Sequence, residues 1–223
     1  MYDIVFISYN ESNADLNYKK LISRFKYARR IHGVKGIHQA HIMAAKLALT
    51  EMFYVVDGDA DVLDSFDFSF TTKDTDYVYV WRSKNPINDL EYGYGGVKLL
   101  PRMATINMDT TKPDMTTSIS TKFKPMLEVS NITAFNTDTF SAWRSAFREC
   151  VKLSSKVIDR QKSDETNRRL ETWKTVGKDR LFGEYAILGA IQGEEYGLLN
   201  KNNLSELKKI NDFDWLLERF NGN

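Results

Sequence analysis

Apolar residues in the first half of the chain form short runs and helical stripes, and these predict alternating strands and helices. Three short runs rich in β-branched or aromatic residues are typical of buried strands; they span residues 2–8, 53–56 and 77–82. Between Ile37 and Met52 the apolar positions recur at helical spacing and predict a largely buried helix. Residues 15–30 are interpreted as a mixed helical or irregular connection, broken at residues 31–33. The pattern therefore predicts an α/β fold.

The second half has fewer strand signals and more helical ones. Residues 83–102 contain two prolines and three glycines and are predicted to be a loop, and residues 103–125 show no clear period and suggest a lid. A short strand is predicted at 132–135, with a helix cap at 136–138. Helices are predicted to follow at four places, which are residues 140–156, 159–174, 182–193 and the tail around Trp215.

The most informative segment is the sequence Asp57-Gly58-Asp59, which follows the buried run at 53–56 directly. Ligands of open α/β sheets bind at the carboxyl ends of the strands, and Gly58 lets the backbone turn tightly there. Two carboxylates at that place suit Mg²⁺ or Mn²⁺, which bridges a diphosphate. The alternative is a plain polar turn, because Asp and Gly are also common turn residues.

Basic residues and histidines surround the predicted central helix. Eight cations and no acid lie in one stretch, namely Lys19, Lys20, Arg24, Lys26, Arg29, Arg30, Lys35 and Lys46. Such a stretch is either a solvated face or a binding site for phosphate. His38 and His41 are three residues apart, a spacing that also occurs in zinc sites. No histidine follows them, so a contact of His38 with phosphate or sugar and packing of His41 beneath it are favoured.

The order of strand, basic loop, helix, strand and Asp-x-Asp resembles the donor-binding half of GT-A glycosyltransferases. Softer matches at residues 91–98, 135–138 and 179–185 resemble glycosyltransferases of T-even-like bacteriophages, some of which modify hydroxymethylated DNA bases. The resemblance implies a single-domain, GT-A-like, Rossmann-type mixed sheet flanked by helices over residues 1–223. It places the nucleotide-sugar and metal half at 1–82 and the acceptor half at 83–223.

The resemblance also assigns roles to residues of the donor site. Donor-binding positions would be Ser8, Tyr9, Asn10 and Glu11 for base and ribose, Arg30, Lys35 and His38 for the diphosphate, and Asp57 with Gly58. Asp57 and Asp59 would hold the Mn²⁺ or Mg²⁺ cofactor, with Asp59 favoured and Asp57 open to a ribose or water-mediated role. The late histidine that many GT-A enzymes use is absent, so an acid, an asparagine, water or phosphate oxygens would complete the coordination.

The remaining roles concern the acceptor and the proton. Asp179 or Glu184 would be the general base of an inverting enzyme, with Asp179 preferred; Glu184 could instead cap its helix, and a retaining enzyme needs neither. Acceptor contacts would come from the predicted loop, through Tyr92, Tyr94, Gly95, Gly96 and Lys98. A glycine-kinked hairpin is the alternative interpretation of that loop.

Composition limits the wider context. The 223 residues are 42% hydrophobic and 27% charged, which is ordinary for a soluble globular protein. The absence of a long apolar run, of a leader and of any cysteine besides Cys150 leads us to expect a cytoplasmic protein without a membrane segment, in the host cytoplasm if it is phage-encoded. A net charge of +1 argues against a strongly basic DNA-binding accessory protein.

The function expected from the sequence is metal-dependent transfer of a sugar from a nucleotide donor, a uridine diphosphate sugar, to an acceptor hydroxyl. A 5-hydroxymethylcytosine-type base in phage DNA is the acceptor that the resemblance suggests. The alternatives are a glycan or protein acceptor, or a nucleotide-binding module without transfer activity.

Overall fold

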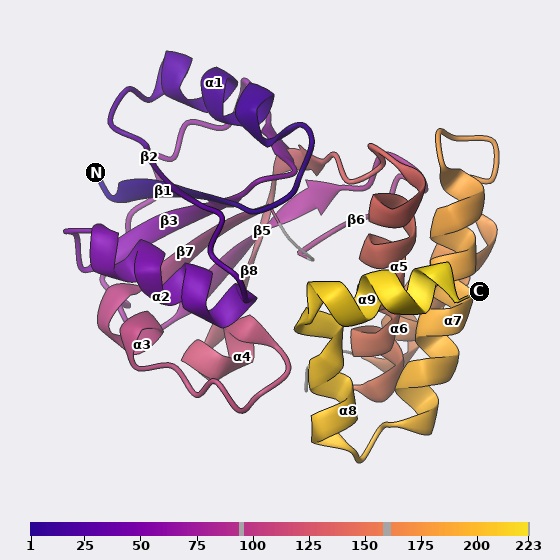
Figure 1. Ribbon diagram of the computed structural model, residues 1–223. Coiled ribbons are helices and arrows are strands. Elements are labelled where there is room, and N and C mark those ends of the chain that lie inside the picture. The colour runs from indigo at the N-terminus through magenta and orange to yellow at the C-terminus, as the bar shows by residue number, and fades with distance from the viewer. Residues whose placement is uncertain (94–95, 158–161, 223) are drawn as a thin grey trace. The chain divides into compact units, whose positions relative to one another are not determined.

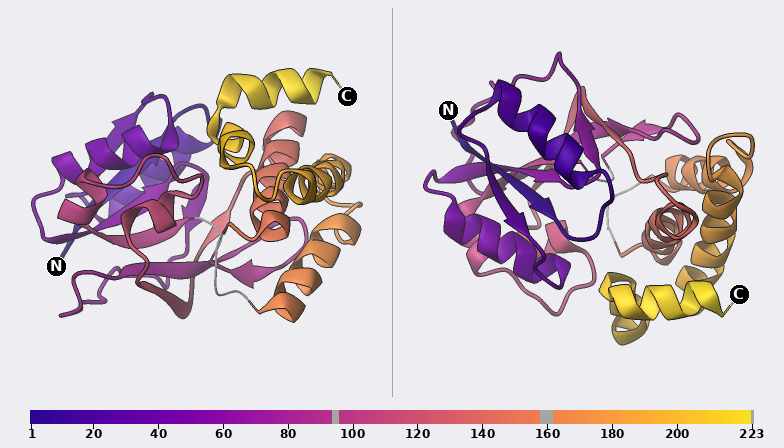
Figure 2. Two further views of the ribbon diagram at one scale, coloured as in Figure 1. Left: turned by 90° about the horizontal axis from the view of Figure 1, so that it is seen from below. Right: turned by 45° about the horizontal axis from the view of Figure 1, so that its top comes forward.

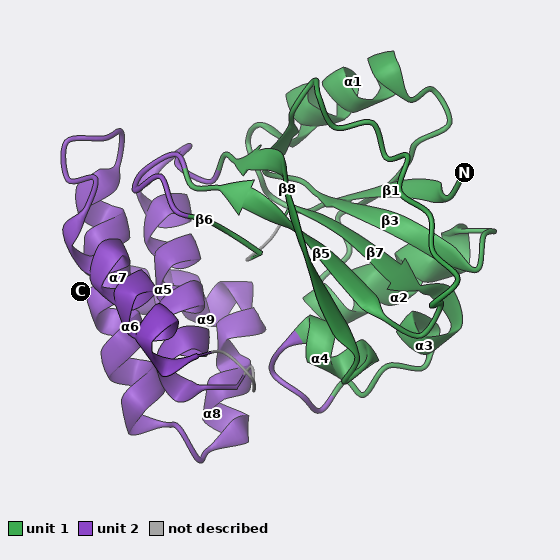
Figure 3. Ribbon diagram, turned by 180° about the vertical axis from the view of Figure 1, so that it is seen from behind, with its two compact units in different colours: residues 1–85, 91–110, 115–134 green, residues 86–90, 111–114, 135–223 purple. Residues whose placement is uncertain are grey.

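The computed structural model of the protein describes residues 1–93, 96–157 and 162–222 (Figure 1). The chain forms two compact units, which Figure 3 distinguishes by colour. Unit 1 comprises residues 1–85, 91–110 and 115–134, and unit 2 comprises residues 86–90, 111–114 and 135–223. Unit 1 contains a mixed sheet and unit 2 is helical, so the predicted α/β class is confirmed.

The described part of unit 1 contains an eight-stranded sheet, in the order β2-β1-β3-β7-β5-β8-β4 with β6 paired to β5. Its strands are β1 (Asp3–Ser8), β2 (Arg29–His32), β3 (Met52–Asp57), β4 (Ala60–Val62), β5 (Val78–Lys84), β6 (Glu91–Tyr92), β7 (Val97–Pro101) and β8 (Phe123–Thr133). Strands β2, β1 and β3 are mutually parallel, as are β5 and β8, while β7 runs antiparallel between β3 and β5. The sheet is therefore mixed, with an uninterrupted parallel part at its β2 end.

Helices cover both faces of this sheet because side chains of successive strand residues alternate between the faces. Tyr54 and Val56 of β3 pack in the cluster that includes Leu21 of α1 (Ala14–Arg24). Phe53 and Val55 pack in the opposite cluster with alanines of α2 (Ile37–Leu47). The right panel of Figure 2 shows α1 and α2 on opposite sides of the strands. Burial on both sides explains why β3 reads as a continuous apolar run.

Three parts of unit 1 differ from the sequence prediction. Residues 29–32 form the edge strand β2 and not a break, because their side chains are only partly buried and give no apolar run. Residues 97–101 form the central strand β7 and not a loop, with Lys98 hidden among apolar neighbours. Strand β8 begins at Phe123 and not at 132. Its first half was not predicted because it is largely exposed and shows no apolar pattern. The predicted lid region contains two short helices, α3 (Arg102–Ile106) and α4 (Met115–Ile119).

Unit 2 is built on helices whose order was predicted, although their limits differ. They are α5 (Thr139–Ser155), α6 (Ser163–Thr175), α7 (Gly183–Leu199), α8 (Leu204–Lys208), the 3-10 turn η1 (Lys209–Asn211) and α9 (Phe213–Asn221). The predicted cap is confirmed, since Asp138 accepts a hydrogen bond from the backbone N–H of Ser141. Trp143 and Phe147 of α5 lie in the buried core of this unit.

Helices α5 and α7 approach closely because glycines of α7 face the backbone of α5. A β-carbon built on Gly189 would lie 2.3 Å from the carbonyl oxygen of Trp143, and one on Gly193 would lie 2.4 Å from that of Phe147. Both distances are shorter than any contact a real side chain makes with backbone. Glycine is required here by packing, despite its cost in a helix interior.

We predict that Gly193→Ala lowers the free energy of unfolding by about 2 kcal/mol, because its methyl group would force the two helices apart. Urea unfolding followed by circular dichroism measures the loss. Gly222→Ala is the matched control, since the nearest atom to its β-carbon would be 3.5 Å away. Equal stability of the two variants would show that α5 and α7 yield without cost.

Candidate functional site

The candidate site lies at the carboxyl edge of the three parallel strands of unit 1. In the sheet register Ser8 of β1 pairs with His32 of β2, and Ile7 pairs with Asp57 of β3. The ends of β2, β1 and β3 therefore place His32, Ser8 and Asp57 in a row along one edge. Such an edge is where open α/β sheets bind ligands.

The Asp57-Gly58-Asp59 turn closes tightly against the end of β1. A β-carbon on Gly58 would lie 2.7 Å from Oε2 of Glu11 and 3.0 Å from Cβ of Ser8. The same Oε2 of Glu11 accepts a hydrogen bond from the backbone N–H of Tyr9 at 2.7 Å. A side chain at position 58 would therefore require Glu11 and Ser8 to shift.

The turn is also fixed from its other sides. The side-chain amide of Asn17 in α1 donates to the carbonyl oxygen of Gly58 at 3.0 Å. The carbonyl oxygen of Asp59 accepts from the backbone N–H of Ala134 at 2.7 Å. The side chains of Asp57 and Asp59 are both only partly buried. Their backbone is held in place before any ligand arrives.

Asp57 forms an ion pair with Lys98 of β7. The ammonium Nζ lies 2.7 Å from Oδ2 of Asp57, which also accepts from the backbone N–H of Gly96 at 3.1 Å. The Lys98 side chain is 7% exposed and that of Asp57 is 29% exposed. Burial opposes ionisation of Asp57 most strongly, but Lys98, His41 and the Gly96 hydrogen bond outweigh it and lower its pKa.

His41 lies on α2 over the same face of the sheet and is 2% exposed. Its Nδ1 is 2.8 Å from the carbonyl oxygen of Ile37, so Nδ1 carries the proton and donates. Its Nε2 is buried without a hydrogen-bond partner among the residues that the structure describes. Burial first and the Lys98 charge second lower the pKa of His41 from 6.5 to about 4, so the ring is neutral at pH 7.

Arg30 organises the other end of the row. Its Nε donates to Oγ of Ser8 at 2.9 Å, and its NH1 donates to Oδ1 of Asp15 at 2.6 Å. Its NH2 lies 3.3 Å from Nδ1 of His32, and its guanidinium carbon lies 5.3 Å from the ring centre of Tyr18. The sequence placed Arg30 in a basic loop near a diphosphate; the structure places it in β2, with all three guanidinium nitrogens engaged.

Other residues expected in the donor site surround this edge. Asn10 is exposed after β1, and Tyr9 is partly buried beside it. Lys35 is exposed in the loop before α2, whose first residue, Ile37, follows Gly36. His38 is buried, with Nε2 3.2 Å from Oγ of Ser118 in α4.

The three expected acceptor residues that the structure describes do not lie in an exposed loop. Tyr92 is 5% exposed in β6, and Lys98 is buried in β7. Gly96 has a φ of +86°, and a β-carbon there would lie 2.1 Å from Oδ1 of Asn131. Close approach at Gly96 is therefore made by a side chain of the protein itself. The other two expected residues, Tyr94 and Gly95, lie outside the described residues.

The two candidate bases belong to unit 2. Asp179 is exposed in the turn between α6 and α7. Glu184 is exposed in the first turn of α7, 3.9 Å from Nζ of Lys178, and no side-chain hydrogen bond caps this helix. The capping role considered for Glu184 is therefore wrong.

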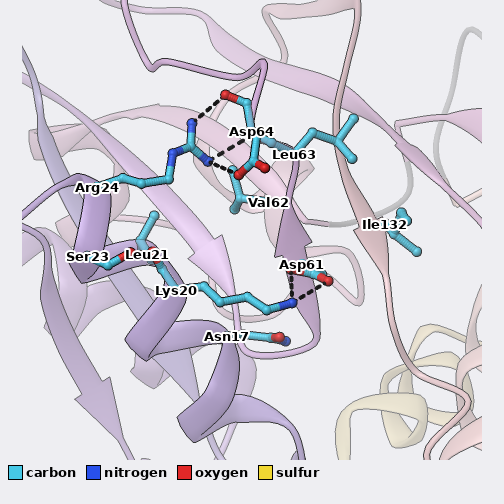
Figure 4. Close-up of a pocket in the computed structure, with 10 residues that line it drawn as sticks. All are labelled: Asn17, Lys20, Leu21, Ser23, Arg24, Asp61, Val62, Leu63, Asp64 and Ile132. Atoms are coloured by element: carbon cyan, nitrogen blue, oxygen red, sulfur yellow. Dashed lines mark hydrogen bonds and ion pairs between the residues drawn. The ribbon is translucent and has the colours of Figure 1, made fainter.

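A pocket between α1 and β4 gathers several of the expected phosphate-binding cations (Figure 4). Lys20 lies 2.8 Å from a carboxylate oxygen of Asp61, and Arg24 donates to the carbonyl oxygens of Leu63 and Asp64. Asp61, the acid two residues after the Asp-x-Asp motif, is thus paired with Lys20. These cations mainly serve to hold α1 to the strand that follows the Asp-x-Asp turn.

A divalent cation is the cofactor that the resemblance implies, and the two acids of the turn fit it unequally. Asp57 is already neutralised by Lys98, and a cation bound to its Oδ2 would meet the ammonium charge. Among residues 1–93, 96–157 and 162–222, no three acidic, cysteine or histidine side chains are grouped to hold an ion. Mg²⁺ is often bound by one or two carboxylates together with substrate phosphates. The donors therefore fit a cation that enters with a diphosphate, with Asp59 as its protein ligand.

Comparison with known proteins adds no assignment. No protein-family model matches the sequence, and no curated protein matches it. None of the described helices is both long and apolar enough to span a membrane.

The structure adds three features that sequence reasoning missed. His32 was interpreted as part of a break, His41 as packing alone, and Lys98 as an acceptor contact. The apolar residues on both sides of Lys98 carried a signal, because Val97, Leu99 and Leu100 are all buried. Its pairing with Asp57 depends on the antiparallel register of β3 and β7, which no local pattern reveals.

We predict that neutral His41 makes stability fall as the pH drops from about 6.5 to about 4. The unfolded chain binds the proton near pH 6.5 and the folded protein only near pH 4, so acid favours unfolding across this interval. The shift corresponds to about 3 kcal/mol. His41→Asn keeps a donor for the Ile37 carbonyl without titrating, and its urea-unfolding curves should show a flatter pH dependence. Parallel curves for both proteins would refute the assignment.

We also predict that Asp57 and Lys98 are energetically coupled. Lys98→Met leaves a partly buried carboxylate unpaired and should cost about 3 kcal/mol of unfolding free energy. The double variant Lys98→Met with Asp57→Asn should recover at least about 1 kcal/mol relative to the sum of the single changes. Urea unfolding of the four proteins measures this coupling, and simple additivity would mean that the pair contributes nothing.

Proposed function

We propose that this protein is a GT-A-like glycosyltransferase that takes a sugar from a nucleotide-sugar donor. One observation carries the proposal: the ends of β2, β1 and β3 form a polar edge, and the Asp57-Gly58-Asp59 turn lies close to Glu11 at that edge and is held by the Asn17 amide. A turn that served only as a chain reversal would need neither the close approach at Gly58 nor the buried amide of Asn17. The edge suits a ligand with a polar head and a charged diphosphate.

The reaction requires that charge on the leaving diphosphate be neutralised. Asp59 would hold Mn²⁺ or Mg²⁺, and the bound cation would supply that neutralisation. Lys98 holds Asp57 ionised and its Oδ2 fixed, so Asp57 has one carboxylate oxygen left to accept a ribose or sugar hydroxyl. Lys35, which is exposed in the loop before α2, is proposed to contact a phosphate together with the amino-terminal N–H groups of α2.

The donor nucleotide is proposed to be a uridine diphosphate, and the proton acceptor is proposed to be Asp179, with Glu184 second. Both carboxylates are exposed and accessible to an acceptor hydroxyl. A hydroxymethylated pyrimidine in DNA remains the proposed acceptor, with phosphate contacts from Lys19 and Lys26, which are exposed. Lys20 and Arg24 are engaged within the protein, so we do not include them among the proposed DNA contacts.

The test is a screen of nucleotide sugars for hydrolysis and transfer in the presence of Mn²⁺, with hydroxymethylated DNA and an oligosaccharide as acceptors. We expect Asp59→Asn to lower metal-dependent turnover at least about 100-fold, because removing a group that stabilises developing charge typically costs that much. Asp61→Asn is the matched control: it is two residues away, pairs with Lys20, and should retain turnover.

Each alternative has its own outcome in this screen. Equal activity of the Asp59 and Asp61 variants would remove Asp59 from the site. Binding of nucleotide sugars without any turnover would identify a nucleotide-binding module. Transfer to the oligosaccharide alone would retain the glycosyltransferase and exclude the DNA acceptor.

A further inference from the structure

His32 is an exposed histidine to which neither the sequence prediction nor the proposed function gives a role. It is the last residue of β2 and its side chain is exposed. It pairs with Ser8 across the sheet, at the end of the row that leads to Asp57. Neighbouring strands lie about 4.8 Å apart, so two spacings place β2 about 10 Å from β3. A nucleoside diphosphate can span that length, with its phosphates near the Asp-x-Asp turn and its base near β2.

The neighbours of His32 determine which ring nitrogen carries a proton. NH2 of Arg30 lies 3.3 Å from Nδ1 of His32, and a guanidinium can only donate. Oγ of Ser8, which accepts from Nε of Arg30, lies 3.0 Å from the same Nδ1 and donates its own proton there. Nδ1 is therefore an acceptor, and the neutral ring carries its proton on Nε2.

Arg30 keeps this arrangement fixed. Its NH1 is paired with Asp15, and its guanidinium lies over the rings of Phe6 and Tyr18. The guanidinium is therefore held by contacts on several sides. Nε2 of His32 has no hydrogen-bond partner among the described residues, and its ring is exposed. The result is a pre-oriented N–H donor at the end of the row.

We propose that Nε2–H of His32 donates to a carbonyl oxygen of the donor's base and selects a keto base of the uracil type over an amino base of the cytosine type. This inference rests on the proposed function and names the residue that sets its donor specificity. A base with an exocyclic amino group would put two donors face to face and leave both unpaired. A base with a carbonyl oxygen completes the hydrogen bond without rearrangement of Arg30 or Ser8.

The experiment compares UDP with CDP, which present a carbonyl oxygen and an amino group at the same ring position. Calorimetry with the full chain should show UDP binding about tenfold more tightly, the value of one good hydrogen bond. His32→Ala should weaken UDP binding about tenfold, leave CDP binding unchanged, and so abolish the preference. His32→Gln should retain most of it, because the Gln amide offers Arg30 an oxygen and the base an N–H.

The outcomes separate this inference from the function on which it rests. If UDP and CDP bind the native protein equally, or if His32→Ala keeps the native preference, the role of His32 is overturned while the nucleotide site stands. If neither nucleotide binds the native protein, the proposed function falls and this inference with it. Circular dichroism confirms that each variant is folded, and the Gln variant tests the role if the Ala variant is not.

Discussion

The buried ion pair between Asp57 and Lys98 is the interaction on which the candidate site depends. Two charges removed from water are costly, and the pair offsets that cost only with good geometry and further hydrogen bonds. Both conditions are met, with a 2.7 Å contact between Nζ and Oδ2 and a second donor at the Gly96 backbone. An apolar pair would fill the same space at less risk. We therefore take the charges at the end of β3 as support for the proposed ligand site.

The pair also divides the edge of the sheet into two chemically different sides. Asp57, Lys98 and His41 lie on the face covered by α2. Asp57 shares this face with Phe53 and Val55, because alternate residues of β3 point to the same side. Ser8 and Arg30 lie on the face covered by α1, close to Phe6 and Tyr18. Fixed charge thus lies near the Asp-x-Asp turn, and fixed hydrogen-bond donors lie near β2. In the proposed function, this asymmetry favours one direction of the nucleotide along the row.

Sequence reasoning succeeded where burial is continuous and failed where it is not. Strand β3 was recognised because Met52 to Val56 are all buried, and the turn after it was placed correctly for the same reason. Strand β2 was missed because it is an edge strand whose only apolar residue is Ile31; its other residues are Arg29, Arg30 and His32. The first half of β8 was missed because its exposed residues carry no alternation, so its pairing with β5 is purely a tertiary effect. The Asp-x-Asp turn and the basic loop were found from local sequence, whereas the partners of Asp57 and Arg30 depend on strand register.

Glycine positions show how the same local signal leads to different structural roles. The sequence suggested that Gly96 leaves room for a ligand, and its φ of +86° does require glycine. The room is occupied by the buried amide of Asn131, which also accepts from Ser83. The backbone N–H of Gly96 donates to the carboxylate of Asp57.

Gly58 also lies close to a side chain of the protein, because a β-carbon built on it would meet the carboxylate of Glu11. The backbone of Gly96 therefore holds the Asp57 carboxylate in place, while Gly58 allows the turn to lie close to Glu11 and Ser8. This difference between the two acids supports the proposal that Asp57 orients the donor and that Asp59 binds the metal.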